Sequence, residues 1–168
     1  MKIGLLSDTH GYLDPKVFQY FSEVDEIWHA GDIGTIEVLH ELQAFKPTIA
    51  VWGNIDGGQI RRECKEGEIF ESEGVRVMIT HIDGKPPKYN AKVLSYVKQY
   101  QPKLLVCGHS HILKVAPDKT NDLLFMNPGA VGKHGFHKIK TMLRFDLEQG
   151  EIKNLEVIEL GARAKLQN

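Results

Sequence analysis

Short groups of aspartate, histidine and asparagine recur along the first two thirds of the sequence, each directly after an apolar run. In chain order they are Asp8-Thr9-His10, Gly31-Asp32, Gly53-Asn54, His81 and Gly108-His109-Ser110-His111. Together these groups offer two carboxylates, four imidazoles and one amide oxygen. Imidazole combined with carboxylate favours Mn, Fe, Co, Ni or Zn over Ca or Mg. The residue types therefore predict a transition-metal site.

The spacing within two of these groups also favours chelation. Residues two apart on an extended segment point the same way, so Asp8 and His10 aim at one site. The same holds for His109 and His111. Seven ligand-type side chains exceed the needs of a single tetrahedral site. A pair of ions about 3.5–4 Å apart that share one carboxylate would use all of them.

The first third of the chain predicts strands and helices in alternation. The expected strands are 2–7, 26–29 and 48–52. One expected helix begins at Asp14-Pro15, and a second spans 35–45. Asp14 before Pro15 is typical of a helix cap followed by proline at the first helical position. A strand-helix-strand-helix-strand order implies a parallel sheet with right-handed crossovers.

The remainder of the chain predicts a second sheet of mixed character. We expect a hairpin of strands 68–71 and 75–80, a helix over 90–100, a strand over 103–107, and antiparallel strands over 112–116, 123–126, 139–146 and 152–160. The mixture indicates an α/β protein of two packed sheets with helices outside. Ligands of open α/β sheets bind beyond the carboxyl ends of the strands. The ligand-type residues follow five such ends, which can converge on one crevice.

Length, charge and cysteine content limit the class of protein. The chain of 168 residues suits a single domain, 1–168. Its net charge of -1 provides no basic field for nucleic acid, so we expect no stable nucleic-acid complex. Cys64 and Cys107 are too few for a disulfide framework. Without a signal-like N-terminus or an apolar run long enough to span a bilayer, we expect a cytoplasmic protein without a membrane partner, and homo-oligomer formation is left open.

Several other residues have both a functional and an ordinary structural interpretation. His29 is either a partner that bonds a metal ligand or a packed strand end, with equal weight. Arg61 and Arg62 could contact a substrate phosphate, although a charged surface pair is the preferred interpretation. A solvated loop is likewise preferred for His134 and His137, and packing for Trp52.

The motifs, taken in order, resemble those of the calcineurin-like metallophosphoesterase superfamily. The family pattern is Asp-x-His, Gly-Asp, Gly-Asn, a later His and Gly-His-x-His, and all five blocks are present between Lys2 and about Gly132. The segment 127–131, Asn-Pro-Gly-Ala-Val, is similar to an element of the small single-domain bacterial and archaeal phosphodiesterases. The resemblance implies a four-layer αββα sandwich, two mixed sheets flanked by helices.

The resemblance also assigns ligands position by position. It implies a first ion held by Asp8, His10, Asp32 and His111, and a second held by Asp32, Asn54, His81 and His109. Asp32 would bridge the two ions, and the catalytic residues would be Asp32, Asn54, His81 and His109. The family typically works with Mn²⁺ among other transition metals. We therefore expect two divalent transition-metal ions, Mn²⁺ first and Zn, Fe, Ni or Co as alternatives.

Two positions depart from the family pattern. Many members have a histidine directly after Gly-Asn, where it contacts phosphate and assists the leaving group; here Ile55 and then Asp56 follow. The small branch often has Cys-Asp there, so the departure suits that branch but disfavours strong monoesterase activity. After His81, where glycine is usual, Ile82 and Asp83 follow, which indicates a reshaped loop.

The activity implied by the resemblance is hydrolysis of a small phosphodiester by hydroxide activated between two metal ions. Substrate candidates are a cyclic nucleotide, an oligonucleotide end or a diester metabolite. The alternative is a non-catalytic metal-binding scaffold, like the eukaryotic retromer subunit of the same fold. A scaffold need not keep every ligand, so the complete set of seven favours the enzyme.

Overall fold

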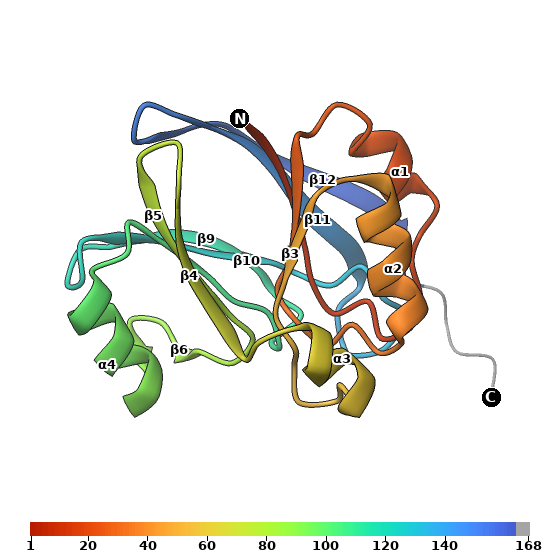
Figure 1. Cartoon of the computed structure of the whole chain (residues 1–168), viewed down its shortest axis with the longest axis horizontal. Coiled ribbons are helices and arrows are strands. Elements are labelled where there is room, and N and C mark those ends of the chain that lie inside the picture. The colour runs from red at the N-terminus through yellow and green to blue at the C-terminus, as the bar shows by residue number, and fades with distance from the viewer. Residues whose placement is uncertain (164–168) are drawn as a thin grey trace.

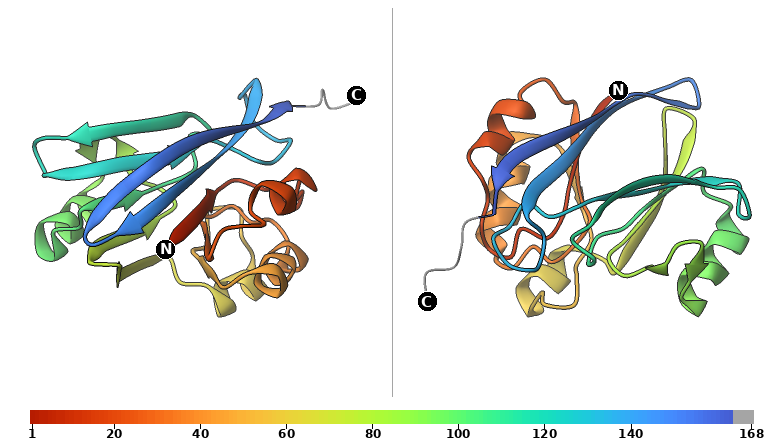
Figure 2. Two further views of the ribbon diagram at one scale, coloured as in Figure 1. Left: turned by 90° about the horizontal axis from the view of Figure 1, so that it is seen from above. Right: turned by 180° about the vertical axis from the view of Figure 1, so that it is seen from behind.

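The computed structural model describes residues 1–163, which form two five-stranded sheets packed face to face (Figure 1). The strand orders are β12-β11-β1-β2-β3 and β4-β5-β8-β10-β9. Figure 2 shows α1 and α2 on one side of the two sheets and α4 on the other. The predicted four-layer sandwich of two mixed sheets between helices is thereby confirmed.

The first sheet combines a parallel half and an antiparallel half. Strands β1 (Lys2–Leu6), β2 (Glu26–His29) and β3 (Thr48–Ala50) are parallel, as predicted. Helices α1 (Lys16–Tyr20) and α2 (Ile36–Phe45) connect them. Strands β11 (Ile139–Glu148) and β12 (Glu151–Ala162) extend the sheet antiparallel from β1. The carboxyl ends of β1, β2 and β3 therefore meet at one edge.

The second sheet brings two further strand ends to the same region. Its strands are β4 (Gly67–Ser72), β5 (Val75–Thr80), β8 (Leu104–Val106), β9 (Leu113–Asp118) and β10 (Leu123–Pro128). Strand β8 is parallel to β5 and β10. Helix α4 (Ala91–Tyr100), which Asn90 caps by accepting the Val93 N–H, packs on the outer face.

Three apolar cores separate the four layers. One lies between the helices α1, α2 and α3 and the first sheet, one between the two sheets, and one between the second sheet and α4. Strand β5 illustrates how period-2 alternation divides side chains between layers: Val77 and Ile79 enter the central core, whereas Met78 packs toward α4. The central strands of both sheets are therefore buried on two faces, which fixes their register.

The structure differs from the sequence expectations in local detail. Helix α3 (Gly58–Glu63) and the small hairpin of β6 (Gly84–Lys85) and β7 (Lys88–Tyr89) were not predicted. Helix α1 is only five residues long, and its N-cap position is occupied by Pro15. Asp14 still accepts the Lys16 N–H at 3.0 Å, and its other oxygen pairs with buried Lys140. None of the helices within residues 1–163 is long and apolar enough to cross a membrane.

Candidate metal centre

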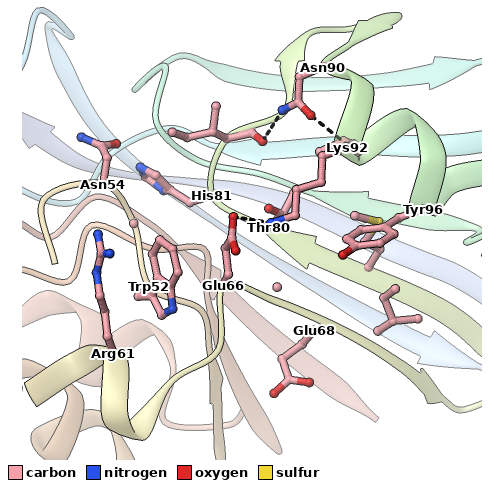
Figure 3. A pocket seen from close by; sticks show the side chains of 16 residues that line it. Trp52, Asn54, Arg61, Glu66, Glu68, Thr80, His81, Asn90, Lys92 and Tyr96 are labelled. Carbon is pink, nitrogen blue, oxygen red and sulfur yellow. Dashed lines mark hydrogen bonds and ion pairs between the residues drawn. The ribbon is translucent and has the colours of Figure 1, made fainter. Parts of the chain in front are cut away.

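The seven ligand-type residues predicted from the sequence all lie in loops beyond the carboxyl ends of strands. Asp8 and His10 follow β1, Asp32 follows β2, Asn54 follows β3, His81 follows β5, and His109 and His111 follow β8. The two sheets bring these five loops to one edge of the sandwich. Asn54 and His81 also line a cavity beside this edge (Figure 3).

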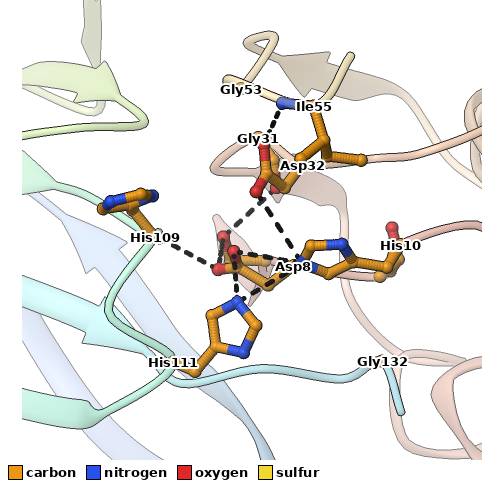
Figure 4. A network of polar contacts seen from close by, with 12 residues as sticks. Asp8, His10, Gly31, Asp32, Gly53, Ile55, His109, His111 and Gly132 are labelled. Atoms are coloured by element: carbon orange, nitrogen blue, oxygen red, sulfur yellow. Dashed lines mark hydrogen bonds and ion pairs between the residues drawn. The ribbon is translucent and has the colours of Figure 1, made fainter. Parts of the chain in front are cut away.

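Asp8, His10 and His111 form the first group of ligand atoms (Figure 4). The His111 Nε2 lies 3.1 Å from Asp8 Oδ1 and 3.3 Å from His10 Nε2. The His10 Nε2 lies 3.8 Å from Asp8 Oδ1. The ligand atoms all lie within 4.8 Å of one another, a spacing at which the three side chains could hold one ion.

Asp32, His81 and His109 form the second group, and Asp32 lies between the two. Its Oδ1 is 3.2 Å from His81 Nε2, and its Oδ2 is 3.7 Å from His10 Nε2 in the first group. One carboxylate therefore faces both groups with different oxygens. His109 is exposed, unlike Asp32 and His81, so the second group is the one open to solvent.

Two buried atoms at the centre indicate that a cation belongs there. Among the described residues, Asp8 Oδ1 and His81 Nε2 have no hydrogen-bond partner. Buried polar atoms are almost always satisfied, so two orphans in one cluster require an explanation. The other ring nitrogen of His81, Nδ1, donates to Ala30 O at 2.7 Å, which leaves the Nε2 lone pair facing the Asp32 carboxylate. A metal ion bound by both groups, or a proton on Nε2 in its absence, would offset the repulsion between this lone pair and the carboxylate.

The second oxygen of Asp8 is held firmly by neighbours. Its Oδ2 accepts the Ser7 hydroxyl at 2.6 Å and the His109 backbone N–H at 3.1 Å. Contacts of this kind fix a metal ligand's orientation and direct its free oxygen toward the ion. The asymmetry of Asp8, with Oδ2 engaged and Oδ1 free, therefore fits a monodentate ligand.

Charges within the cluster shift the pKa values of its members. Burial opposes protonation of His81, but its contact with Asp32 and the charge of Asp8 raise the pKa above the usual value. Burial likewise opposes protonation of His111, and contact with Asp8 raises its pKa. For His10 burial prevails and lowers the pKa. His81 and His111 thus hold protons more tightly than free imidazoles, and a metal ion must compete with these protons for the ring nitrogens.

Five of the seven residues have left-handed backbone conformations. The φ angles are 55° at Asp8, 49° at His10, 54° at Asp32, 65° at His109 and 58° at His111. Non-glycine residues rarely adopt positive φ, and such conformations cluster at functional sites because the surrounding structure must enforce them. The concentration of strain in these loops shows that the fold enforces the directions of the ligand side chains.

Asp56 is the group that holds two of the strained loops together, and sequence reasoning missed this role. Its carboxylate, 3% exposed, accepts backbone N–H groups from Gly53 at 2.7 Å, Ile33 at 3.1 Å and Gly34 at 2.7 Å. These amides belong to the loops that carry Asp32 and Asn54. Gly53 must be glycine, because a Cβ there would lie 2.1 Å from Asp32 Oδ1. The sequence signal that could have revealed this role is the position of Asp56, two residues after the predicted ligand Asn54.

His29 supports the site from beneath, which resolves the two interpretations of this residue. The Thr9 hydroxyl donates to Ile33 O at 2.9 Å, so His29 Nε2–H donates to the same hydroxyl oxygen at 3.0 Å. His29 Nδ1 then accepts the Gly31 N–H at 3.1 Å. Burial lowers the pKa of His29 to about 4, which keeps the ring neutral. His29 thus ties together the loops after β1 and β2 without facing the metal groups directly.

The loop 130–137 also reaches the site, contrary to the preferred interpretation of a solvated loop. The His134 ring lies 5.6 Å from that of His10, and His137 Nδ1 lies 3.4 Å from His111 Nδ1. Because His137 Nε2 donates to Gly132 O at 3.1 Å, its Nδ1 is an acceptor. His111 is thereby held with Nδ1–H outward and Nε2 toward Asp8. No residue pattern in the loop signalled these contacts.

Within the Asn-Pro-Gly-Ala-Val segment, Asn127 is the residue that contacts a ligand loop. Its side-chain amide donates to Gly108 O at 2.7 Å and to Ser110 Oγ at 3.1 Å, and its Oδ1 accepts the Gly129 N–H at 2.9 Å. The side chain therefore fixes the loop that carries His109 and His111.

A four-layer sandwich with clustered Asp and His at one sheet edge is the class of structure expected for metallophosphoesterases. Residues 1–150 match the calcineurin-like phosphoesterase superfamily domain, and the chain belongs to this family. The chain is 34% identical over 136 residues to a probable metallophosphoesterase of Methanocaldococcus jannaschii, which covers 77% of this chain and 68% of the relative.

Two solved structures extend the comparison. The structure of a novel archaeal phosphodiesterase matches with a TM-score of 0.72 and 26% identity over 95% of this chain and 100% of its own. Vps29 of Chaetomium thermophilum matches with a TM-score of 0.77 and 14% identity over 98% of this chain and 100% of its own. At 14% identity the likeness to Vps29 concerns the fold alone.

Proposed function

We propose that the chain is a two-metal phosphodiesterase. The observation that carries the proposal is one buried atom without a hydrogen-bond partner in each ligand group, Asp8 Oδ1 in the first and His81 Nε2 in the second, with Asp32 facing both groups. Membership of the phosphoesterase family and the likeness to a solved archaeal phosphodiesterase support the reaction class.

The proposed ligand sets share Asp32. Asp8, His10, Asp32 and His111 would hold one ion, and Asp32, Asn54, His81 and His109 would hold the other. The first set is largely buried, and in the second Asn54 and His109 are exposed beside the cavity. The substrate phosphate would therefore approach from the side of Asn54, His81 and His109. Four imidazoles with two carboxylates suit Mn²⁺ or another transition metal, and we propose Mn²⁺ in a cytoplasmic protein.

Two bound ions would supply a water of lowered pKa as nucleophile and positive charge for the phosphate oxygens. The chain's own contribution is to position the reacting groups. The Asp56 carboxylate and Asn127 side chain fix the ligand loops through backbone contacts, so little reorganisation is needed during the reaction. Exposed His109 borders the open side of the centre, where its imidazole can contact an incoming phosphate.

The leaving group receives no evident proton from the loop after Asn54. Ile55 is 47% exposed and carries no acid, and its backbone N–H donates to Asp32 Oδ1 at 3.1 Å. Asp56 is turned away and accepts three backbone amides, so its carboxylate is not available as an acid. General acid assistance typically supplies roughly 10²–10⁴-fold. The enzyme should therefore prefer diesters with acidic leaving groups over alkyl monoesters.

The scaffold alternative has less support. A shared fold with Vps29 does not distinguish a scaffold from an enzyme. Strain at five ligand positions and buried orphan atoms are costs that a scaffold surface would not require.

The direct test is hydrolysis of bis(p-nitrophenyl) phosphate by protein treated with EDTA and then loaded with Mn²⁺. We expect no turnover in EDTA, recovery with Mn²⁺, and loss of at least about 100-fold in Asp32→Asn, which weakens the shared ligand. Asp122→Asn is the matched control, because Asp122 is an exposed residue in the turn between β9 and β10 and is not one of the proposed ligands. Full turnover in chelator, with elemental analysis showing no bound metal, would refute the proposal.

A further inference from the structure

A cavity of about 520 Å³ opens directly beside the metal centre (Figure 3). Asn54 and His81 form its border with the centre, and α3, β4, the end of β5 and α4 form its other walls. The cavity is therefore placed to receive whatever is attached to a phosphate bound at Asn54 and His81.

The size and walls of the cavity exceed what a phosphate alone requires. Sites of about 300–1,000 Å³ typically enclose organic ligands of drug size. Ile69, Met78 and Val93 provide apolar contacts, and Trp52 and Tyr96 provide aromatic faces. A methyl or ethyl ester would leave most of this surface uncovered, whereas a planar ring with an attached sugar would cover it.

Arg61 lines the cavity on the same side as Asn54 in Figure 3. Its Nε donates to Asp56 O at 2.8 Å, and its guanidinium carbon lies 4.1 Å from the centre of the Trp52 ring. Within the described residues, no hydrogen bond or ion pair engages its two Nη groups. An arginine fixed by stacking and by Nε, with both Nη groups free, is suited to bidentate contact with a phosphate.

The far side of the cavity carries carboxylates that are each paired with a lysine. Glu68 lies away from Asn54 in Figure 3 and pairs with Lys65 at 3.1 Å, and Glu66 pairs with Lys92 at 2.6 Å. Carboxylates repel a second phosphate but accept hydrogen bonds from ring N–H and amino groups. With little net charge and with carboxylate oxygens as acceptors, this side of the cavity suits a neutral group that carries N–H donors.

We propose that this cavity binds a nucleoside esterified to the reacting phosphate, and that Arg61 contacts that phosphate. The inference rests on the proposed phosphodiesterase function and adds the substrate class, a nucleoside phosphodiester. Tyr96 and Trp52 supply the aromatic contacts for the base, and Arg61 fixes the phosphate at the border with Asn54.

The test compares two diesters that share one leaving group. Thymidine 5′-(p-nitrophenyl phosphate) carries a nucleoside and methyl p-nitrophenyl phosphate carries none, so both release p-nitrophenolate. With Mn²⁺-loaded protein, kcat/KM should be at least about tenfold higher for the nucleoside ester, the effect of stacking one base. Tyr96→Ala should narrow that ratio several-fold. Circular dichroism confirms that each variant is folded.

Arg61→Gln tests the phosphate contact, with Arg62→Gln as the matched control. Arg62 is the next residue of α3, is exposed and does not line the cavity. Arg61→Gln should lower kcat/KM for both diesters by about 10- to 100-fold, mainly through KM, and Arg62→Gln should change it less than twofold. Equal losses in the two variants would overturn the role of Arg61.

A binding measurement separates the cavity from the chemistry. Thymidine 5′-monophosphate should change the fluorescence of Trp52 saturably in protein held in EDTA, and methyl phosphate should not. Equal kcat/KM for the two diesters, or no response to the nucleotide, would overturn the nucleoside inference while leaving the phosphodiesterase intact. Failure to hydrolyse either diester or bis(p-nitrophenyl) phosphate with Mn²⁺ would instead refute the proposed function.

Discussion

Replacement of Asp56 by asparagine should destabilise the protein far more than the isosteric change suggests. The carboxylate accepts three backbone amides with two oxygens, two of them at Oδ2 and one at Oδ1. An asparagine keeps one acceptor oxygen and must present its NH₂ group to at least one backbone N–H. The change therefore leaves a buried donor unsatisfied and removes the charge that strengthens the other two bonds.

The expected cost is about 2–4 kcal/mol, from about 1–3 kcal/mol for the unsatisfied donor plus the lost charge assistance. For a domain of this size, 1 kcal/mol shifts the melting temperature by about 2–4 °C. Asp56→Asn should thus melt roughly 5–15 °C below the wild type in EDTA, measured by circular dichroism.

Asp122→Asn is the control, because Asp122 is 88% exposed and its pair with Lys103 is a surface ion pair. Such pairs contribute about 0–1 kcal/mol, so the control should melt within a few degrees of the wild type. Asp56→Asn should also bind Mn²⁺ about 10- to 100-fold more weakly, because its loops carry Asp32 and Asn54. If Asp56→Asn and Asp122→Asn melt at the same temperature, Asp56 does not clamp the loops.

Four further outcomes follow from the site. Mn²⁺ at 100 times its dissociation constant should stabilise the fold by about 2.7 kcal/mol; identical melting curves with Mn²⁺ and with EDTA would contradict metal binding. His29 has a pKa of about 4 in the folded protein, below its unfolded value of 6.5. Its contribution to the free energy of unfolding is therefore fully present above pH 6.5 and is lost as the pH falls toward 4. Urea titrations in EDTA should show this loss of stability, and the loss should be smaller in His29→Gln. His137→Phe should weaken Mn²⁺ binding about 10-fold by releasing the His111 ring, whereas Phe136→Ala, at a fully exposed side chain, should not. Ile55→His should raise turnover of alkyl monoesters more than that of aryl diesters; a wild type that already prefers alkyl monoesters would show that another residue donates the proton.

The sequence was sufficient to predict the architecture because each layer depends on local periodicity. The apolar runs that end at Ser7, His29 and Trp52 indicated the parallel half of the first sheet, and the runs 68–71 and 75–80 indicated the hairpin of β4 and β5. Helix α3 was missed because it is only six residues long and begins with Gly58, and glycine has a low helix propensity. Its helical form depends on Ile60 in the core and on Arg61 bonded to Asp56 O, which are tertiary contacts.

The ligand-type residues could be found because strand ends in α/β sheets are where ligands bind. The residues that hold the ligand loops in place could not be found in this way, because they contact those loops across large sequence separations. Asn127 bonds the loop at Gly108, and His137 contacts His111 from a glycine-rich loop without periodicity. The cavity is likewise formed only when α3, β4 and α4 come together, so neither its volume nor the orientation of Arg61 could be derived from spacing.

The central claim is that seven side chains hold two metal ions that share Asp32. The most direct measurement is an anomalous-difference map from crystals of Mn²⁺-loaded protein. We expect two peaks about 3.5–4 Å apart, one beside Asp8, His10 and His111 and the other beside Asn54, His81 and His109, with Asp32 contacting both. A single peak, or peaks away from Asp32 at saturating Mn²⁺, would contradict the account.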